Sequence, residues 1–265
     1  MFAIVLALLG TAQAQSEHAL HEAQFGHLTP TVDAPRMPRG SATPGPDMTV
    51  YGYQAYWNAD LNAVPWDDLT HIAIFSANVE TNGTLTHTGR WSDTATAVAM
   101  GAPYGVRVHL CVTNFSSSEL TTLLSSTTAR ATLVSTLKTW VDDTGAHGVN
   151  IDFESLPSSQ RANMVSFVQE LEAASVGDIV LATPAVDWSD AWDYAALTER
   201  ADLFIMGYGY HWSGGSPGPG DPLYGGGIWS AWSLDWSITD YVTTNGADPN
   251  RIILGLPLYG REWPV

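Results

Sequence analysis

One short segment of the chain carries polar residues at strand spacing. Residues 148–154 read GVNIDFE and follow a stretch with helix-like spacing. Side chains on a strand alternate between two faces, so Asn150, Asp152 and Glu154 share one face, opposite an apolar one. Burying two carboxylates is costly unless they have partners or a task. The spacing favours an acid with an electrostatic partner, although carboxylates that only cap a helix or bind an arginine would give the same pattern.

Segments with strand and helix character alternate from residue 48 onward. Each short β-rich run precedes a longer segment with helix-like spacing. The expected strands are 49–55, 71–78, 106–113, 148–153, 179–184, 203–208 and 252–257, and the clearest helices are 117–144 and 158–174. Ser158 and Ser159 are expected to cap the second helix. Alternation of this kind indicates a parallel sheet, and seven strands predict an α/β fold, a (β/α)8 TIM barrel that lacks its eighth strand in this chain.

The N-terminal residues have the composition of export and linker segments. Residues 1–14 form a short apolar run that ends in a small-x-small triplet, as in a signal peptide. Residues 15–47 are polar and contain five prolines, which is typical of a linker or leader. The barrel domain is predicted to span residues 48–265, and the protein is predicted to be secreted or held in the cell envelope.

The composition excludes several classes of partner. The 265-residue chain has a formal net charge of -17 at pH 7, and such a surface repels both nucleic-acid phosphates and anionic membranes. Cys111 is the only cysteine, and its apolar surroundings predict a buried, inert thiol. The histidines are scattered and show no zinc-binding spacing, so no metal is expected. A monomer is the default expectation.

Aromatic residues are frequent near the ends of the expected strands. In barrels of this type, chemistry lies at the carboxyl ends of the strands. Flat apolar rings with polar edges suit stacking on sugars, although the same rings could simply fill the barrel. The candidate substrate contacts are Tyr53, Phe75, Asn114, Asn150, Met206, Tyr210, Trp212, Tyr259 and Arg261.

Five segments occur in an order and at intervals typical of one enzyme family. The segment GVNIDFE is similar to the signature D-G-x-D-x-D-x-E of glycoside hydrolase family 18, the chitinase-like enzymes. GYQAYW, HIAIFSANV, IMGYGYHW and IILGLPLYGREW resemble the family's first, second, sixth and seventh strands. The triplet TNF at 113–115 and the runs HWSG and PGP within 211–219 resemble the branch that contains spore-cortex-lytic endo-N-acetylglucosaminidases. The resemblance covers residues 48 to 263.

This resemblance implies a mechanism and a substrate class. In family 18 the acetamide of the substrate serves as the nucleophile, and configuration is retained. Glu154 would be the general acid and then the base, Asp152 would orient the acetamide, and Tyr208 would donate a hydrogen bond to it. The implied partner is a β-1,4-linked N-acetylglucosamine polymer, with chitin, peptidoglycan and N-glycan cores all left open. No cofactor is implied.

The chain departs from the family pattern at three positions. His147 and Asn150 replace the first and middle Asp of the signature strand, and Gly209 replaces the Asp that follows Tyr208 in the motif M-x-Y-D. That last Asp usually helps to position the distorted sugar. The absent eighth strand would also remove a tryptophan under the reactive sugar. These departures leave a second function open, a non-catalytic, lectin-like barrel that binds chitin or peptidoglycan.

Overall fold

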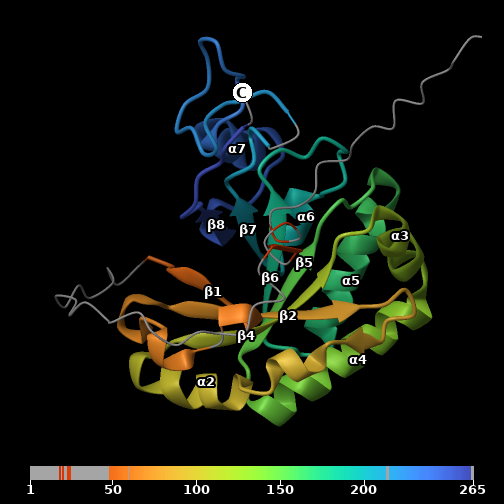
Figure 1. Cartoon of the computed structure of the whole chain (residues 1–265). Coiled ribbons are helices and arrows are strands. Elements are labelled where there is room, and N and C mark those ends of the chain that lie inside the picture. The colour runs from red at the N-terminus through yellow and green to blue at the C-terminus, as the bar shows by residue number, and fades with distance from the viewer. Residues whose placement is uncertain are drawn as a thin grey trace, which may run out of the picture.

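The centre of the protein is a curled parallel sheet with helices packed against it (Figure 1). The computed structural model describes residues 18, 20, 23, 24, 48–58, 60–212 and 215–263. Seven strands follow the order β1-β2-β4-β5-β6-β7-β8, and a short β3 pairs with β2 antiparallel. Their bounds are Tyr51–Ala55 (β1), His71–Val79 (β2), Leu85–Thr86 (β3), Arg107–Asn114 (β4), Gly148–Phe153 (β5), Asp178–Pro184 (β6), Asp202–Met206 (β7) and Ile252–Gly255 (β8). The predicted barrel with one strand missing is confirmed, and β1 and β8 are the edge strands of the sheet.

The helices vary in length, and none among the described residues is long and apolar enough to cross a membrane. The α-helices are Thr94–Gly101 (α2), Ser117–Ser125 (α3), Thr127–Thr144 (α4), Arg161–Ala173 (α5), Tyr194–Thr198 (α6) and Leu234–Ile238 (α7). Short 3-10 turns are Tyr56–Asn58 (η1), Leu61–Ala63 (η2), Trp66–Asp68 (η3), Thr88–Trp91 (η4), Ala102–Tyr104 (η5), Ser158–Gln160 (η6) and Pro249–Arg251 (η8), and Thr239–Thr244 (η7) is a π-helical turn.

Two local predictions about the helices are wrong. The single helix expected over 117–144 is divided at Ser126, whose backbone is extended and whose Oγ accepts a hydrogen bond from the N–H of Ala129. Ser126 thus begins α4 as its N-cap and cannot continue α3. Ser158 and Ser159 do not cap the later helix either, because they form the turn η6 and neither η6 nor α5 has a side-chain cap.

The central strand β5 separates the core from the interior of the curled sheet. Val149, Ile151 and Phe153 are fully buried in the main core, and the ring of Phe153 stacks on Phe167 of α5 with centroids 5.9 Å apart. Each such side chain stabilises the fold by about 1.5–3 kcal/mol. Because faces alternate along a strand, this packing fixes the opposite face of β5 toward the interior of the sheet. The predicted alternation is therefore confirmed.

Gly148 begins β5 at a point of close approach between strands. A Cβ at this position would overlap the backbone carbonyl oxygen of Asp178 on β6. Only glycine lacks that atom, so it lets β5 and β6 meet at their amino ends.

The predicted signal peptide, residues 1–14, lies outside the described residues. So does nearly all of the predicted leader, residues 15–47, of which only His18, Leu20, Ala23 and Gln24 are described.

Candidate active site

Two carboxylates lie together at the carboxyl end of β5. The side chain of Asp152 is fully buried, and that of Glu154 is 10% exposed. One carboxylate oxygen of each lies within 4.8 Å of the other. The backbone N–H of Glu154 donates to the carbonyl of Asn114 on β4 (3.0 Å), and Ser155 with φ 61° then turns the chain away from the strand. The Oδ1 atom of Asp152 is buried and has no hydrogen-bond partner among the described residues.

Asn150 lies one step earlier on the same face of β5 and joins three strands. Its Nδ2 donates to Tyr53 Oη on β1 (3.1 Å), and its Oδ1 accepts from Cys111 Sγ on β4 (3.2 Å). Cys111 is buried, as predicted. These bonds fix the amide and the Tyr53 ring beneath Asp152.

Tyr208 follows β7 and faces the same two carboxylates. Burial, with the charges of Asp152 and Glu154, raises the pKa of Tyr208 well above its ordinary value, so the hydroxyl stays protonated and can donate. Met206 lies two residues earlier and packs in a cluster with Tyr53 and Tyr208. The ring of Tyr259 is 6.1 Å from that of Tyr208, and burial, with the charge of Glu154, also raises the pKa of Tyr259.

A cleft of about 520 Å³ opens beside these residues. Glu154, Met206, Tyr208, Tyr210 and Trp212 all line it. The hydroxyl of Tyr210 lies 2.7 Å from Ser237 Oγ, which fixes the ring against α7. The structure thus brings the predicted acid, its neighbour tyrosine and several predicted substrate contacts to one cavity.

Other predicted contacts lie around this cleft or away from it. Phe75 is buried on β2 and packs with Tyr53. A Cβ placed on Gly209, which has φ +80°, would lie 3.9 Å from Arg261 Nη2, so Arg261 stands where the missing Asp side chain would point. Asn114 does not line the cleft.

The polar atoms of Asn114 are used in the turn after β4. Its Nδ2 donates to the Val79 carbonyl and to Glu119 Oε2 (both 3.0 Å), and its Oδ1 accepts from the N–H of Ser116 (2.9 Å). This residue positions the start of α3.

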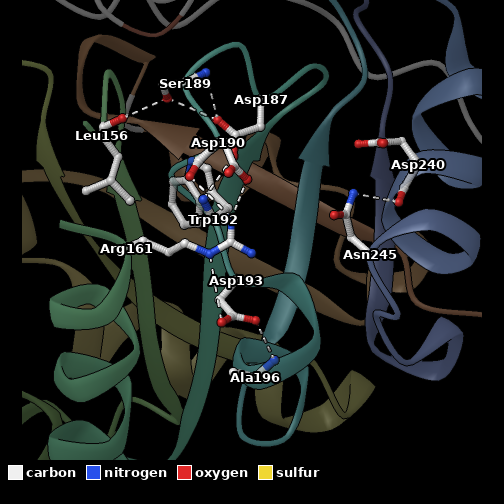
Figure 2. Close-up of polar contacts among 10 residues, drawn as sticks. All are labelled: Leu156, Arg161, Asp187, Ser189, Asp190, Trp192, Asp193, Ala196, Asp240 and Asn245. Carbon is white, nitrogen blue, oxygen red and sulfur yellow. Dashed lines mark hydrogen bonds and ion pairs between the residues drawn. The ribbon is translucent and has the colours of Figure 1, made fainter. Parts of the chain in front are cut away.

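The loop after β6 forms a further wall, and a polar network holds it (Figure 2). Asp187 accepts hydrogen bonds from the N–H and hydroxyl of Ser189 through Oδ1, and from the N–H of Trp192 through Oδ2. Arg161 of α5 forms an ion pair with Asp190. Trp188 lines the cleft between these anchors, yet its side chain is 74% exposed. Trp188 follows the strand expected over 179–184, and its place just past a strand end is the position at which the sequence predicts aromatic residues near the site.

His18 occupies the space between the predicted catalytic residues. Its Nδ1 is 2.5 Å from Asp152 Oδ2 and 3.8 Å from Glu154 Oε1, and its Nε2 is 3.1 Å from Tyr208 Oη. Its ring centroid is 5.4 Å from those of Tyr53 and Phe75. Burial alone would lower the pKa of His18, but the charge of Asp152, its hydrogen bond and the charge of Glu154 raise it to about 9. Nothing in the polar leader sequence predicts this contact.

Two clusters among the described residues could bring ligand atoms to a metal ion. One is His18, Asp152 and Glu154, and the other is His71, His109 and Asp178. The pKa of His18 is raised to about 9, so a proton competes with any metal ion for its imidazole nitrogens at neutral pH. Glu154 and Asp152 are placed so that Glu154 can transfer a proton while Asp152 carries a negative charge beside it.

The chain matches one known protein family over most of its length. The family model for glycosyl hydrolases family 18 matches residues 49–265. The protein named "Putative sporulation-specific glycosylase YdhD" from Bacillus subtilis is 28% identical over 207 residues, which are 73% of this chain and 46% of that protein. Its crystal structure superposes with a TM-score of 0.62 at 25% identity, covering 71% of this chain and 62% of the other. The chain spans about half the length of this curated relative.

Two further solved structures share the fold. Catalytic domain 2 of the Group II chitinase from Ostrinia furnacalis, a mutant solved with penta-N-acetylchitooctaose (NAG)5, has a TM-score of 0.72 at 19% identity, covering 80% of this chain and 64% of its own. The Bacillus cereus spore cortex-lytic enzyme SleL has a TM-score of 0.63 at 20% identity, covering 80% and 52%. The predicted family resemblance is confirmed.

Proposed function

Because the chain belongs to glycosyl hydrolase family 18, we propose that it is a glycosidase that cleaves β-1,4-linked N-acetylglucosamine polymers by substrate-assisted, retaining catalysis. One observation carries this proposal. Asp152 keeps a buried carboxylate oxygen without a partner among the described residues, beside Glu154 and Tyr208. An unsatisfied buried acceptor costs about 1–3 kcal/mol, and the N–H of a bound acetamide would satisfy it.

The proposed steps follow from the positions of three side chains. Glu154 gives its proton to the glycosidic oxygen as the bond to the anomeric carbon breaks, while the acetamide carbonyl oxygen of the same sugar attacks that carbon. Asp152 accepts a hydrogen bond from the acetamide N–H and stabilises the positive oxazolinium ion, and Tyr208 donates a hydrogen bond to the acetamide. Water then attacks the anomeric carbon as its bond to the acetamide oxygen breaks, and the water passes a proton to Glu154, which restores the acid.

The substrate is proposed from the relatives and the shape of the site. Chitin and the glycan of peptidoglycan both carry the N-acetyl group that the mechanism needs. The rings of Tyr210, Trp212 and Trp188 line one cleft and offer apolar surfaces to sugar faces. We also propose export from the cytoplasm, which rests on the apolar run at residues 1–14.

One observation favours the second candidate function, a lectin-like barrel that binds without cleaving. Gly209 lacks the carboxylate that the family has after Tyr208, and its backbone at φ +80° is a conformation that glycine adopts readily. A site that has lost this group could hold a sugar without distorting it.

Product analysis distinguishes the two functions. Purified, folded full-length protein and its Glu154→Gln variant are incubated with chitohexaose and with peptidoglycan fragments, and the products are identified by mass spectrometry. Cleavage by the parent and almost none by the variant is the expected result. Binding of either glycan without cleavage by the parent would favour the lectin-like barrel and overturn the proposed enzyme.

A further inference from the structure

A second cluster of histidine and carboxylate side chains lies at the amino ends of the strands, opposite the active site. His71 begins β2, His109 is the third residue of β4, and Asp178 begins β6. One ligand atom from each lies within 4.8 Å of the others, and His109 Nε2 is 3.1 Å from Asp178 Oδ2. His109 is completely buried. The cluster therefore joins three strands inside the curled sheet.

Gly148 explains why two of these side chains can meet across an intervening strand. In the sheet register Gly148 of β5 pairs with His109 on one side and with Asp178 on the other. It belongs to the same face as Asn150 and Asp152, which points to the interior. Any side chain at this position would stand between His109 and Asp178.

Hydrogen bonds to the outer nitrogens orient both imidazoles. Tyr51 Oη lies 3.0 Å from His109 Nδ1, and Thr70 Oγ1 lies 2.9 Å from His71 Nδ1. Each ring therefore has Nε2 left for the cluster. Partners of this kind on the distal nitrogen hold histidine ligands in place in metal sites.

We propose that His71, His109 and Asp178 form a binding site for a divalent transition metal ion, with Zn²⁺ as the best-suited probe. Two imidazole nitrogens and one carboxylate oxygen are a ligand set that Zn²⁺ accepts, with water completing the coordination. At Zn–N and Zn–O distances of about 2.0–2.2 Å, tetrahedral ligand atoms lie about 3.3 Å apart. The His109–Asp178 pair already has this separation, so binding requires mainly the approach of His71.

Binding changes two existing contacts of the cluster. The proton that His109 Nε2 now shares with Asp178 moves to Nδ1 and is donated to Tyr51 Oη, which frees Nε2 for the ion. Arg107 forms an ion pair with Asp178 through Oδ2. Its side chain is 43% exposed, so it can keep one carboxylate oxygen or turn to solvent while the metal takes the other. The ion would fasten the amino ends of β2, β4 and β6 together.

Metal titration of the full-length protein tests this site. Isothermal calorimetry with Zn²⁺ is expected to show one equivalent bound and a raised Tm, with at least tenfold weaker binding in His71→Ala. The exposed His87 provides the matched control, so His87→Ala should bind like the parent. His18→Ala should also bind like the parent, which excludes the other cluster. Absence of binding in the parent, or equal affinity in His71→Ala and His87→Ala, would overturn the proposal.

An independent observation concerns the contact of His18 with the candidate active site. Its imidazole bridges Asp152 Oδ2 and Tyr208 Oη, the two groups that would hold the substrate acetamide. The side chain of His18 is only 13% exposed, and aromatic rings of β1 and β2 surround it. A sugar cannot occupy this position while His18 does.

We infer that His18 is an internal inhibitor of the active site, a role that rests on the proposed function. Substrate must then displace a buried imidazolium–carboxylate pair before it binds. His18 lowers the apparent affinity for the glycan, because only molecules from whose active site His18 is released can bind it.

Glycan binding in an inactive background separates this inference from the proposed activity. Chitohexaose is titrated into Glu154→Gln and into the double variant His18→Ala/Glu154→Gln, with His87→Ala/Glu154→Gln as the control. The His18 double variant is expected to bind at least fivefold more tightly, and the control to bind like Glu154→Gln. Equal affinities in all three would overturn the inhibition, whether or not the parent cleaves. If the parent cleaves, His18→Ala should raise kcat/KM by a similar factor.

Discussion

Histidine and carboxylate side chains meet both at the carboxyl ends and at the amino ends of the strands, but the pKa of the histidine is shifted in opposite directions at the two places. At the carboxyl ends, His18 lies between two carboxylates, and its pKa is raised to about 9. At the amino ends, His71 lies near one carboxylate that Arg107 already neutralises, and burial lowers the pKa of His71 to about 4. Burial disfavours the charged imidazole at both places, and only at His18 do neighbouring carboxylates outweigh it.

The two ends also differ in how well their polar atoms are satisfied. Asp178 contacts both His109 and Arg107, whereas Asp152 keeps one buried oxygen without a partner among the described residues. A satisfied carboxylate stabilises the fold, and an unsatisfied one can bind a ligand. The proposed sugar chemistry uses the unsatisfied carboxylate at the carboxyl ends of the strands, and the proposed metal site uses Asp178 at the amino ends.

Replacement of the proposed acid should have the largest effect on activity. Glu154→Gln keeps the shape but cannot deliver a proton, so kcat on chitohexaose is expected to fall by about 10²–10⁴-fold. The exposed Glu80→Gln is the control and should retain parental kcat. Product formation followed by chromatography measures both. If Glu154→Gln were as active as the parent, Glu154 would not be the general acid.

A methyl group at the strand junction should have the largest effect on stability. In Gly148→Ala the new Cβ overlaps the backbone of β6, and the expected loss in the free energy of unfolding is about 3 kcal/mol. A Cβ on Gly89 would meet nothing within 4 Å, so Gly89→Ala should cost little. Urea unfolding at one protein concentration compares the two variants. Similar midpoints for both would show that β5 and β6 can move apart at no cost.

Removal of one tyrosine hydroxyl at the carboxyl ends of the strands and of another at the amino ends compares the two regions directly. Tyr208→Phe deletes the donor to the substrate acetamide and leaves a buried acceptor unsatisfied, so kcat/KM should fall by about 5–100-fold, the equivalent of about 1–3 kcal/mol. Tyr51→Phe deletes the contact with His109 at the other end and should leave kcat/KM near the parental value while it weakens Zn²⁺ binding. Steady-state kinetics of both variants gives the comparison, and equal losses of activity would contradict the division of roles.

The smallest expected effect is that of pH on the inhibition by His18. Asp152, Glu154, Tyr208 and Tyr53 face His18, and its pKa in the folded protein is above the unfolded value of 6.5. Docking of His18 is therefore fully favoured below about pH 6.5 and is lost as the pH rises through about 9. The ratio of kcat/KM between His18→Ala and the parent should fall severalfold, toward one, over this range. A ratio that does not change with pH would show that His18 binds as the neutral ring.

The sequence predicts those features that depend on local alternation. The faces of β5 follow from the alternation of Val149, Ile151 and Phe153 with polar residues, and this pattern also places Asp152 inside the sheet. The division of the long helix at Ser126 is harder to predict, because serine is tolerated within helices and only the observed capping bond to Ala129 marks a boundary.

Contacts between distant segments are not predictable from the sequence. His71, His109 and Asp178 are far apart in the chain and have no metal-binding spacing, and the strand register brings them together. Asn114 is predicted to contact substrate from its place at a strand end, yet its amide is used by the following turn. The contact of His18 depends on tertiary structure alone.

The loop after β6 has no regular secondary structure over residues 185–193, but a side-chain carboxylate binds two of its backbone amides (Figure 2). The amides of Ser189 and Trp192 both donate to the carboxylate of Asp187. In hydrogen–deuterium exchange these two amides are protected until their hydrogen bonds to Asp187 break, so they should exchange slowly and at similar rates. Trp188 lies between the carboxylate of Asp187 and the two amides bound to it, so a glycan stacked on this ring would meet a side chain whose backbone is held on both sides.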